Sequence, residues 1–146
     1  MKRLIFETPE VLIDIPLYNR VILIIGDSGS GKSFICNQIS DSKSDTKLMA
    51  EVKSNWNLND ILIVRSKLEV EAIKSKHGKL IIIDRADMIL SEDDIEFINT
   101  SDNQFILMYR GKLKKIKANM NSYIQLASKI IDGKVYIKGL LPCEKW

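Results

Sequence analysis

Residues 21–33 read Val21-Ile22-Leu23-Ile24-Ile25-Gly26-Asp27-Ser28-Gly29-Ser30-Gly31-Lys32-Ser33. The first five are apolar without polar alternation, which is typical of a parallel strand covered on both faces. The next eight match the pattern G-x-x-x-x-G-K-S/T at every fixed position. A helix is expected from Gly31 or Lys32 to about Ile39. The stretch therefore predicts a strand, a glycine-rich loop and a helix in succession.

This spacing suits a loop that binds phosphate. Glycines at 26, 29 and 31 allow successive backbone N–H groups to point inward, and the following helix N-terminus favours negative charge. Lys32 is expected to reach the β- and γ-phosphates, and the Ser33 hydroxyl to ligate Mg²⁺. The predicted nucleotide-binding residues are Gly26, Asp27, Ser28, Gly29, Ser30, Gly31, Lys32, Ser33 and Phe34.

The remaining apolar runs alternate with helical patterns. Further strands are predicted at Ile61–Val64, Leu80–Ile83 and Gln104–Tyr109, with helices from Ser66 to His77 and from Ser91 to about Ile98. Residues 41–59 are polar and predict a loop with one short element near Leu48–Val52. This order indicates an α/β fold with a mostly parallel sheet flanked by helices.

A β-hairpin is expected at each end of the chain. The N-terminal hairpin joins Arg3–Phe6 to Val11–Ile15, and the C-terminal one joins Tyr123–Ile131 to Lys134–Leu140. Asp132-Gly133 is the dipeptide that a two-residue type I′ turn favours. No repeat or linker divides the chain, so residues 1–146 are interpreted as a single nucleotide-binding domain.

A carboxylate follows one of the buried strands. Asp84 comes directly after Leu80–Ile83, at the carboxyl end where open α/β sheets bind ligands. A magnesium-bound triphosphate usually has a carboxylate at this place. Ser33 and Asp84 are therefore the predicted metal residues.

Together these two motifs resemble those of the P-loop NTPase superfamily, with Gly26–Ser33 as Walker A and Leu80–Asp84 as Walker B. The extra strand between them is similar to the RecA-like and AAA-like division. That resemblance implies a fourth strand, Gln104–Tyr109, between the two motif strands. It also implies a polar residue at the tip of that strand that senses the γ-phosphate, here Tyr109 or Arg110.

One position departs from the pattern of this division. A catalytic glutamate normally follows the Walker B aspartate, but position 85 is Arg. Asp87 is the nearest spare carboxylate and is the candidate replacement. The candidate catalytic residues are thus Lys32, Asp87 and Arg110, and hydrolysis is expected to be slow.

Charge is unevenly distributed along the chain. The chain carries 22 Lys/Arg and 19 Asp/Glu, and residues 110–146 hold nine of the former and two of the latter. This basic region predicts either a solvated surface or an anionic partner, nucleic acid or an acidic protein. No apolar run approaches the roughly 20 residues of a membrane span. The two cysteines form no framework or metal motif, so a cytoplasmic protein is expected.

The leading interpretation is an ATP-binding protein with Mg²⁺, a slow ATPase acting as a nucleotide-gated module. A regulatory or interaction protein without turnover is the first alternative, and a small-molecule kinase is the second. GTP is less favoured than ATP because no Asn-Lys-x-Asp-like guanine motif occurs. An oligomer that supplies an arginine from a neighbouring subunit is compatible with the incomplete catalytic set.

Overall fold

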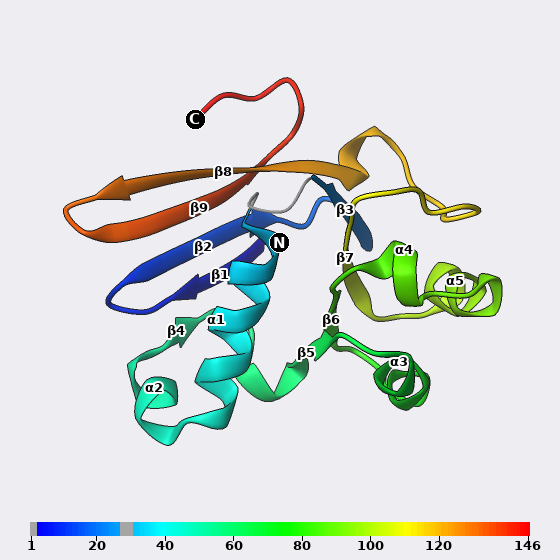
Figure 1. Ribbon diagram of the computed structural model, residues 1–146, viewed down its shortest axis with the longest axis horizontal. Helices are drawn as coiled ribbons and strands as arrows, with labels where there is room; N and C mark the ends of the chain where they lie inside the picture. Colours follow the sequence, from blue (N-terminus) through cyan, green and yellow to red (C-terminus); the bar gives the residue numbers. More distant parts are fainter. Residues whose placement is uncertain (1–2, 27–30) are drawn as a thin grey trace.

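The computed structural model describes residues 3–26 and 31–146. Nine strands in these ranges form one mixed sheet with helices on both faces (Figure 1). The strands are β1 (Arg3–Glu7), β2 (Val11–Pro16), β3 (Val21–Ile25), β4 (Lys53–Ser54), β5 (Ile61–Val64), β6 (Leu80–Ile83), β7 (Gln104–Tyr109), β8 (Tyr123–Ile131) and β9 (Lys134–Leu140). The helices are α1 (Lys32–Ser44), α2 (Thr46–Glu51), α3 (Lys67–Ile73), α4 (Ala86–Ile89) and α5 (Glu92–Thr100), with 3-10 turns at Leu58–Asp60 and Met120–Ser122.

The sheet has two halves of different construction. Its strand order is β4-β1-β2-β9-β8-β3-β7-β6-β5. Strands β3, β7, β6 and β5 are parallel to their neighbours, and β8 is parallel to β3. The other half consists of two antiparallel hairpins joined by a parallel β2–β9 pairing, with the short β4 beside β1. The α/β class is therefore confirmed, but the sheet as a whole is mixed.

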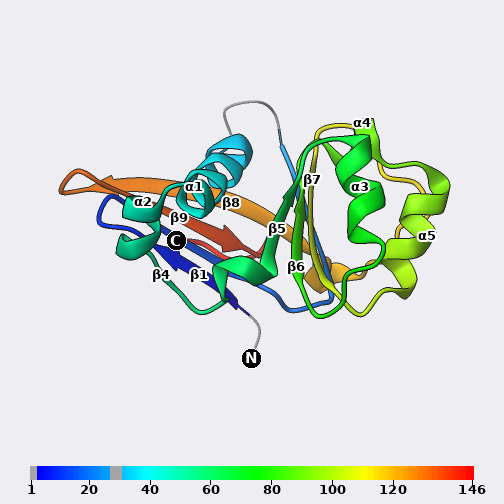
Figure 2. The same cartoon turned by 90° about the horizontal axis from the view of Figure 1, so that it is seen from below.

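Both faces of the parallel half are buried, which explains its uninterrupted apolar strands. Ile22 and Ile24 of β3 pack in one hydrophobic cluster with α1, whereas Val21 and Leu23 pack in a second cluster with α3, α4 and α5. Figure 2 shows the parallel strands between α1 on one side and these three helices on the other. Burial on both sides stabilises each such side chain by roughly 1.5–3 kcal/mol.

Both predicted hairpins are confirmed. β1 pairs antiparallel with β2, and β8 pairs antiparallel with β9 from Gln125↔Leu140 to Ile131↔Lys134. The connecting residues Asp132 and Gly133 have φ of 51° and 78°. A type I′ turn requires positive φ at both central positions, which is why this dipeptide suits the turn.

The helix boundaries differ from the sequence-based expectation. Helix α1 continues past Ile39 to Ser44, because Ser42 is buried and the Lys43 ammonium donates to the Ile61 carbonyl. Helix α2 corresponds to the short element that was predicted near Leu48–Val52, whereas α3 already ends at Ile73. The short α4 was not predicted, since its four residues are too few to show a helical period.

Asp94 joins two of the three helices that cover the second cluster. It closes the predicted capping box with Ser91 at the start of α5 and is only 1% exposed. Burial alone would raise the pKa of its carboxyl. Hydrogen bonds from Lys67 and Lys74 instead hold this pKa well below its usual range. The carboxylate therefore stays ionised and ties α5 to α3.

Candidate functional site

The described part of the phosphate-loop pattern lies at the junction of β3 and α1. Gly31 precedes the helix with φ 101°, a conformation that L side chains avoid, and its carbonyl accepts the Ile35 N–H. Glycine has no side chain to cap the first helical turn, so the N–H groups of that turn are left for another acceptor. Of the predicted binding residues, Asp27, Ser28, Gly29 and Ser30 lie outside the described residues.

Lys32 is oriented back toward the end of β3. Its side chain is 8% exposed, and its ammonium donates to the Gly26 carbonyl. Ser33 and Phe34 are exposed at the start of the same helix. An ammonium held at the loop beside exposed helical N–H groups is suited to contact an anion placed there.

Asp84 lies at the carboxyl end of β6 and faces α1. Its backbone N–H donates to the Val64 carbonyl over 2.9 Å, and its side chain is 8% exposed. Burial raises the pKa of the Cys36 thiol to about 12, and the negative charge of Asp84 acts in the same direction. Leu80 and Ile82 of β6 pack with Cys36 in the cluster that contains α1, so Asp84, two residues beyond Ile82, lies on the same side of the sheet as α1. Because Ser33 and Cys36 are three residues apart on α1, they share a helix face, and Asp84 lies near the face that carries the Ser33 hydroxyl.

The end of β7 lies between Gly26, which follows β3, and Asp84, which follows β6. β7 pairs with β3 on one side and with β6 on the other, and the Gly26 N–H donates to the Tyr109 carbonyl over 3.2 Å. Tyr109 is buried, and burial raises the pKa of its phenol. Arg110, the next residue, is exposed at this edge. Of the two candidate sensors, Arg110 has the accessible side chain.

Asp87 contacts the backbone that follows Arg110. Its Oδ2 accepts the Gly111 N–H over 2.8 Å. A Cβ placed on Gly111 would lie 2.8 Å from the same oxygen, so the close approach depends on glycine. The Oδ2 atom of the candidate catalytic carboxylate is thus hydrogen-bonded to the backbone of the loop after β7.

Arg65 was missed by the sequence analysis. It directly follows β5, donates from Nη2 to the Asn37 side chain of α1 over 2.7 Å, and faces the Cys36 thiol. Its Nε is buried and makes no hydrogen bond to any described residue. The position was readable, because Arg65 ends a predicted strand in the same way as Arg110 does.

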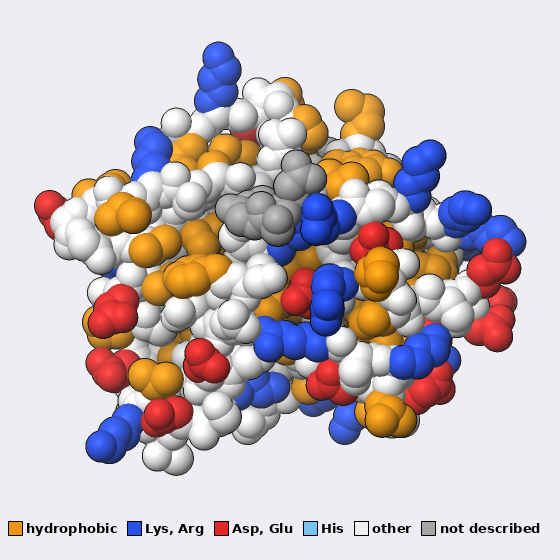
Figure 3. Space-filling view, in the orientation of Figure 1, with side chains coloured by type: hydrophobic (Ala, Val, Ile, Leu, Met, Phe, Trp, Pro, Cys, Tyr) orange, Lys and Arg blue, Asp and Glu red, His pale blue; other side chains and the backbone are white. Residues whose placement is uncertain are grey.

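Three adjacent parallel strands therefore each have an arginine just beyond their carboxyl end. Arg65 follows β5, Arg110 follows β7, and Arg85 lies one residue after Asp84 at β6. Arg85 is exposed and adopts the left-handed conformation with φ 52°. In Figure 3, Lys and Arg side chains gather near the centre of the face that is seen there. This edge is electropositive, which favours an anionic ligand.

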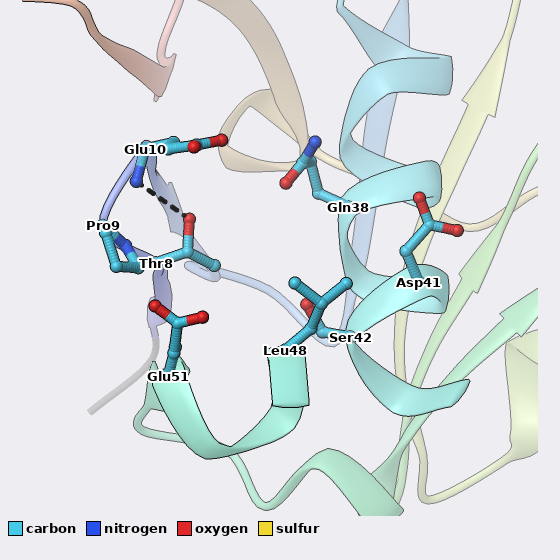
Figure 4. A pocket seen from close by; sticks show the side chains of 8 residues that line it. All are labelled: Thr8, Pro9, Glu10, Gln38, Asp41, Ser42, Leu48 and Glu51. Atoms are coloured by element: carbon cyan, nitrogen blue, oxygen red, sulfur yellow. Dashed lines mark hydrogen bonds between the residues drawn. The ribbon is translucent and has the colours of Figure 1, made fainter. Parts of the chain in front are cut away.

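A cavity of about 220 Å³ lies elsewhere, between the last turns of α1, helix α2 and the β1–β2 turn (Figure 4). Three carboxylates line it: Glu10, Asp41 and Glu51. A phosphate would be repelled by this lining. Across the described residues, no group of three or more His, Cys, Asp or Glu side chains is placed to hold a metal ion. This cavity is therefore not a candidate for either predicted ligand.

The basic segment after β7 turns away from the phosphate edge. Lys115 pairs with Glu92 of α5 at 3.5 Å, and the backbone N–H of Lys117 donates to the Asn99 side chain of the same helix. The segment therefore runs along α5, and only its first residues lie at the edge where β7 ends.

Comparisons of the chain with protein-family models, curated proteins and solved structures gave no match. Within residues 3–26 and 31–146, no helix has both the length and the apolar character that crossing a membrane requires.

Proposed function

We propose that the chain is a P-loop nucleotide-binding protein that holds the phosphates of ATP, with Mg²⁺, at Gly26–Ser33. The observation that carries this proposal is that the buried Asp84 follows β6 on the side of the sheet that α1 covers, the helix that begins with Lys32 and Ser33. A hydroxyl from the helix and a carboxylate from a neighbouring strand, completed by phosphate oxygens and water, are what magnesium nucleotide sites use.

The strand order gives further support. β7 separates β3, which precedes the phosphate loop, from β6, which is followed by Asp84. This is the order implied by the resemblance to RecA-like and AAA-like proteins. With it, Lys32 and Arg110 would contact the β- and γ-phosphates, and Phe34 would lie beside the bound nucleotide.

A binding protein without turnover is the second candidate. The observation that favours it is the hydrogen bond from Gly111 to Asp87, which occupies an oxygen of the only replacement carboxylate proposed for the missing glutamate. Such a protein would use nucleotide to set a conformation. A small-molecule kinase remains the third proposal and has no specific contact in its favour.

The test is the shift in melting temperature that Mg-ATP produces. Ligand at 100 times its dissociation constant stabilises the folded state by about 2.7 kcal/mol. At roughly 2–4 °C per kcal/mol for a chain of this size, the melting temperature should rise by about 5–11 °C. Lys32→Ala should lose most of this rise, and Asp84→Asn should lose the part that depends on Mg²⁺.

The shift is compared within each variant, because Lys32→Ala also removes a hydrogen bond to Gly26 and lowers the melting temperature without ligand. Lys47→Ala is the matched control, since Lys47 is exposed on α2. This variant should respond as the unaltered chain does. If millimolar Mg-ATP and Mg-GTP both leave the melting curve unchanged, the proposal is wrong.

A further inference from the structure

One face of the C-terminal hairpin is not covered by a helix. Ile124 and Ile137 point to the other face, where they pack in the cluster that contains α1. The alternate side chains of β8 and β9 point away from α1, and none of them is buried. They are Tyr123, Gln125, Ala127, Lys129, Ile131, Lys134, Tyr136, Lys138 and Leu140.

Aromatic rings and lysines lie together on this uncovered face. The Trp146 ring centre is 4.8 Å from the Lys129 Nζ and 5.0 Å from the Lys138 Nζ. Lys129 is paired with Tyr136 across the hairpin, and the Lys134 Nζ is 5.8 Å from the Tyr136 ring. Cation–π contacts of this kind hold an aromatic ring against the sheet, and the lysine ammonium groups lose little of their hydration. This arrangement was not predicted, because it depends on the last residues of the chain folding back over the β8–β9 hairpin.

The lysines beside Trp146 are available to an outside anion. Lys134 forms an ion pair with Glu7, but among the described residues neither Lys129 nor Lys138 pairs with a carboxylate. They belong to the segment 110–146, in which nine Lys/Arg stand against two Asp/Glu. The uncovered face therefore complements a polyanion.

We propose that the uncovered face of β8–β9, with Trp146 at its centre, binds single-stranded nucleic acid. Lysines on an open sheet neutralise phosphates, and aromatic rings between them stack on unpaired bases. An acidic protein would satisfy the lysines but makes no use of the rings, and a duplex hides its bases. This inference does not rest on nucleotide binding, because the face is formed by the hairpin and not by the phosphate loop.

The test measures binding by the fluorescence anisotropy of labelled single strands of about 12 nucleotides, oligo-dT and oligo-rU, at about 50 mM salt. Their affinities are compared with that of a duplex of equal length. Single strands should bind more tightly than the duplex. Trp146→Ala should weaken single-strand binding by about 5- to 150-fold, the equivalent of one stacked base. Trp146→Phe, which keeps a ring, should retain most of the affinity.

The lysines are tested through salt. Lys129→Gln with Lys138→Gln should make the slope of log affinity against log salt shallower by about 1.4, from about 0.7 per phosphate. Lys112→Gln with Lys114→Gln is the matched control: it removes two exposed charges from the same basic region away from this face, and the slope should not change. Thermal melts establish that each variant is folded.

Three results would overturn the proposal. One is the absence of single-strand binding by the unaltered chain. Another is an equal loss of affinity in the control pair, which would place the contact on the segment after β7. The third is binding of polyglutamate with the same dependence on Trp146 and Lys129, which would identify an acidic protein as the partner.

Discussion

Substitutions of Asp87 can show whether this carboxylate has a catalytic or a structural role at the proposed nucleotide site. Its Oδ2 accepts the Gly111 N–H, which immediately follows Arg110. We expect Asp87 to act mainly as an anchor for the loop that carries Arg110. Asp87→Asn keeps an oxygen that accepts this hydrogen bond but cannot take a proton from water. Asp87→Ala removes both abilities, so the two variants separate the two roles.

The expected magnitude follows from the geometry. A hydrogen bond to a charged group contributes about 1.5–3 kcal/mol when buried. Asp87 is half-buried and Gly111 is exposed, so competition from water reduces the figure to about 1 kcal/mol. Asp87→Ala should therefore lower the melting temperature by roughly 2–4 °C. Asp87→Asn should melt close to the unaltered chain. Asp93→Asn, at an exposed carboxylate of α5, is the control.

The same proteins are then assayed for phosphate release from Mg-ATP. Turnover should be well below the roughly 1–100 s⁻¹ of kinases, because Arg85 stands where a glutamate is expected. If Asp87 acts as an anchor for the loop that carries Arg110, Asp87→Asn should keep the phosphate-release activity and Asp87→Ala should lose it. If Asp87→Asn abolishes turnover without lowering the melting temperature, the carboxylate is the base and the anchor argument is refuted. Equal melting of the Asn and Ala variants would refute it as well.

Two further predictions concern Asp94, which joins α5 to α3, and the two cysteines. Folding lowers the pKa of Asp94, so its contribution is present above the unfolded value near 3.9 and is lost as pH falls below it. Asp94→Asn should destabilise the chain at pH 7 and flatten the loss of stability in acid, as urea titrations at several pH values would reveal. Cys36 is fully buried with a pKa of about 12, whereas Cys143 is exposed. Alkylation at pH 8, followed by mass spectrometry, should modify only Cys143 until the chain is unfolded; early labelling of Cys36 would contradict this.

Short sequence patterns predicted the parts of the fold that depend on residues adjacent in the chain. The apolar runs at β3, β6 and β7 were readable because strands buried on both faces need no polar alternation. The Asp132-Gly133 turn was readable because its positive φ angles select those residues. The end of α1 was not predicted correctly. Ser42 is buried by tertiary contacts, and the polar sequence around it gives no indication of that burial.

Pairing between distant segments left no comparable signal. β2 pairs with β9, more than 120 residues further on, and joins the two hairpins into one half of the sheet. Arg65 and Trp146 were missed for related reasons. Arg65 required the rule already applied to Asp84 and Arg110, that residues just beyond parallel strands meet at one edge. Trp146 required knowledge of which strands lie beneath it.

The charges at the carboxyl edge of the parallel strands support a common interpretation of these residues. Among the described residues at this edge, Lys32, Arg65, Arg85 and Arg110 are cationic, and the carboxylates near them include Asp84, Asp87 and Glu69, whose Oε1 accepts the Arg65 N–H. Like charges at one edge repel, and burying Lys32 adds a desolvation cost, so the arrangement opposes folding unless an anion or a carboxylate compensates. Within the part of the chain that the structure describes, these three carboxylates are outnumbered by the four cations. A polyphosphate that brings its own Mg²⁺ would supply the remaining negative charge without neutralising Asp84. The same excess that costs stability in the free chain would then contribute to affinity, since electrostatic complementarity steers an anion to this edge.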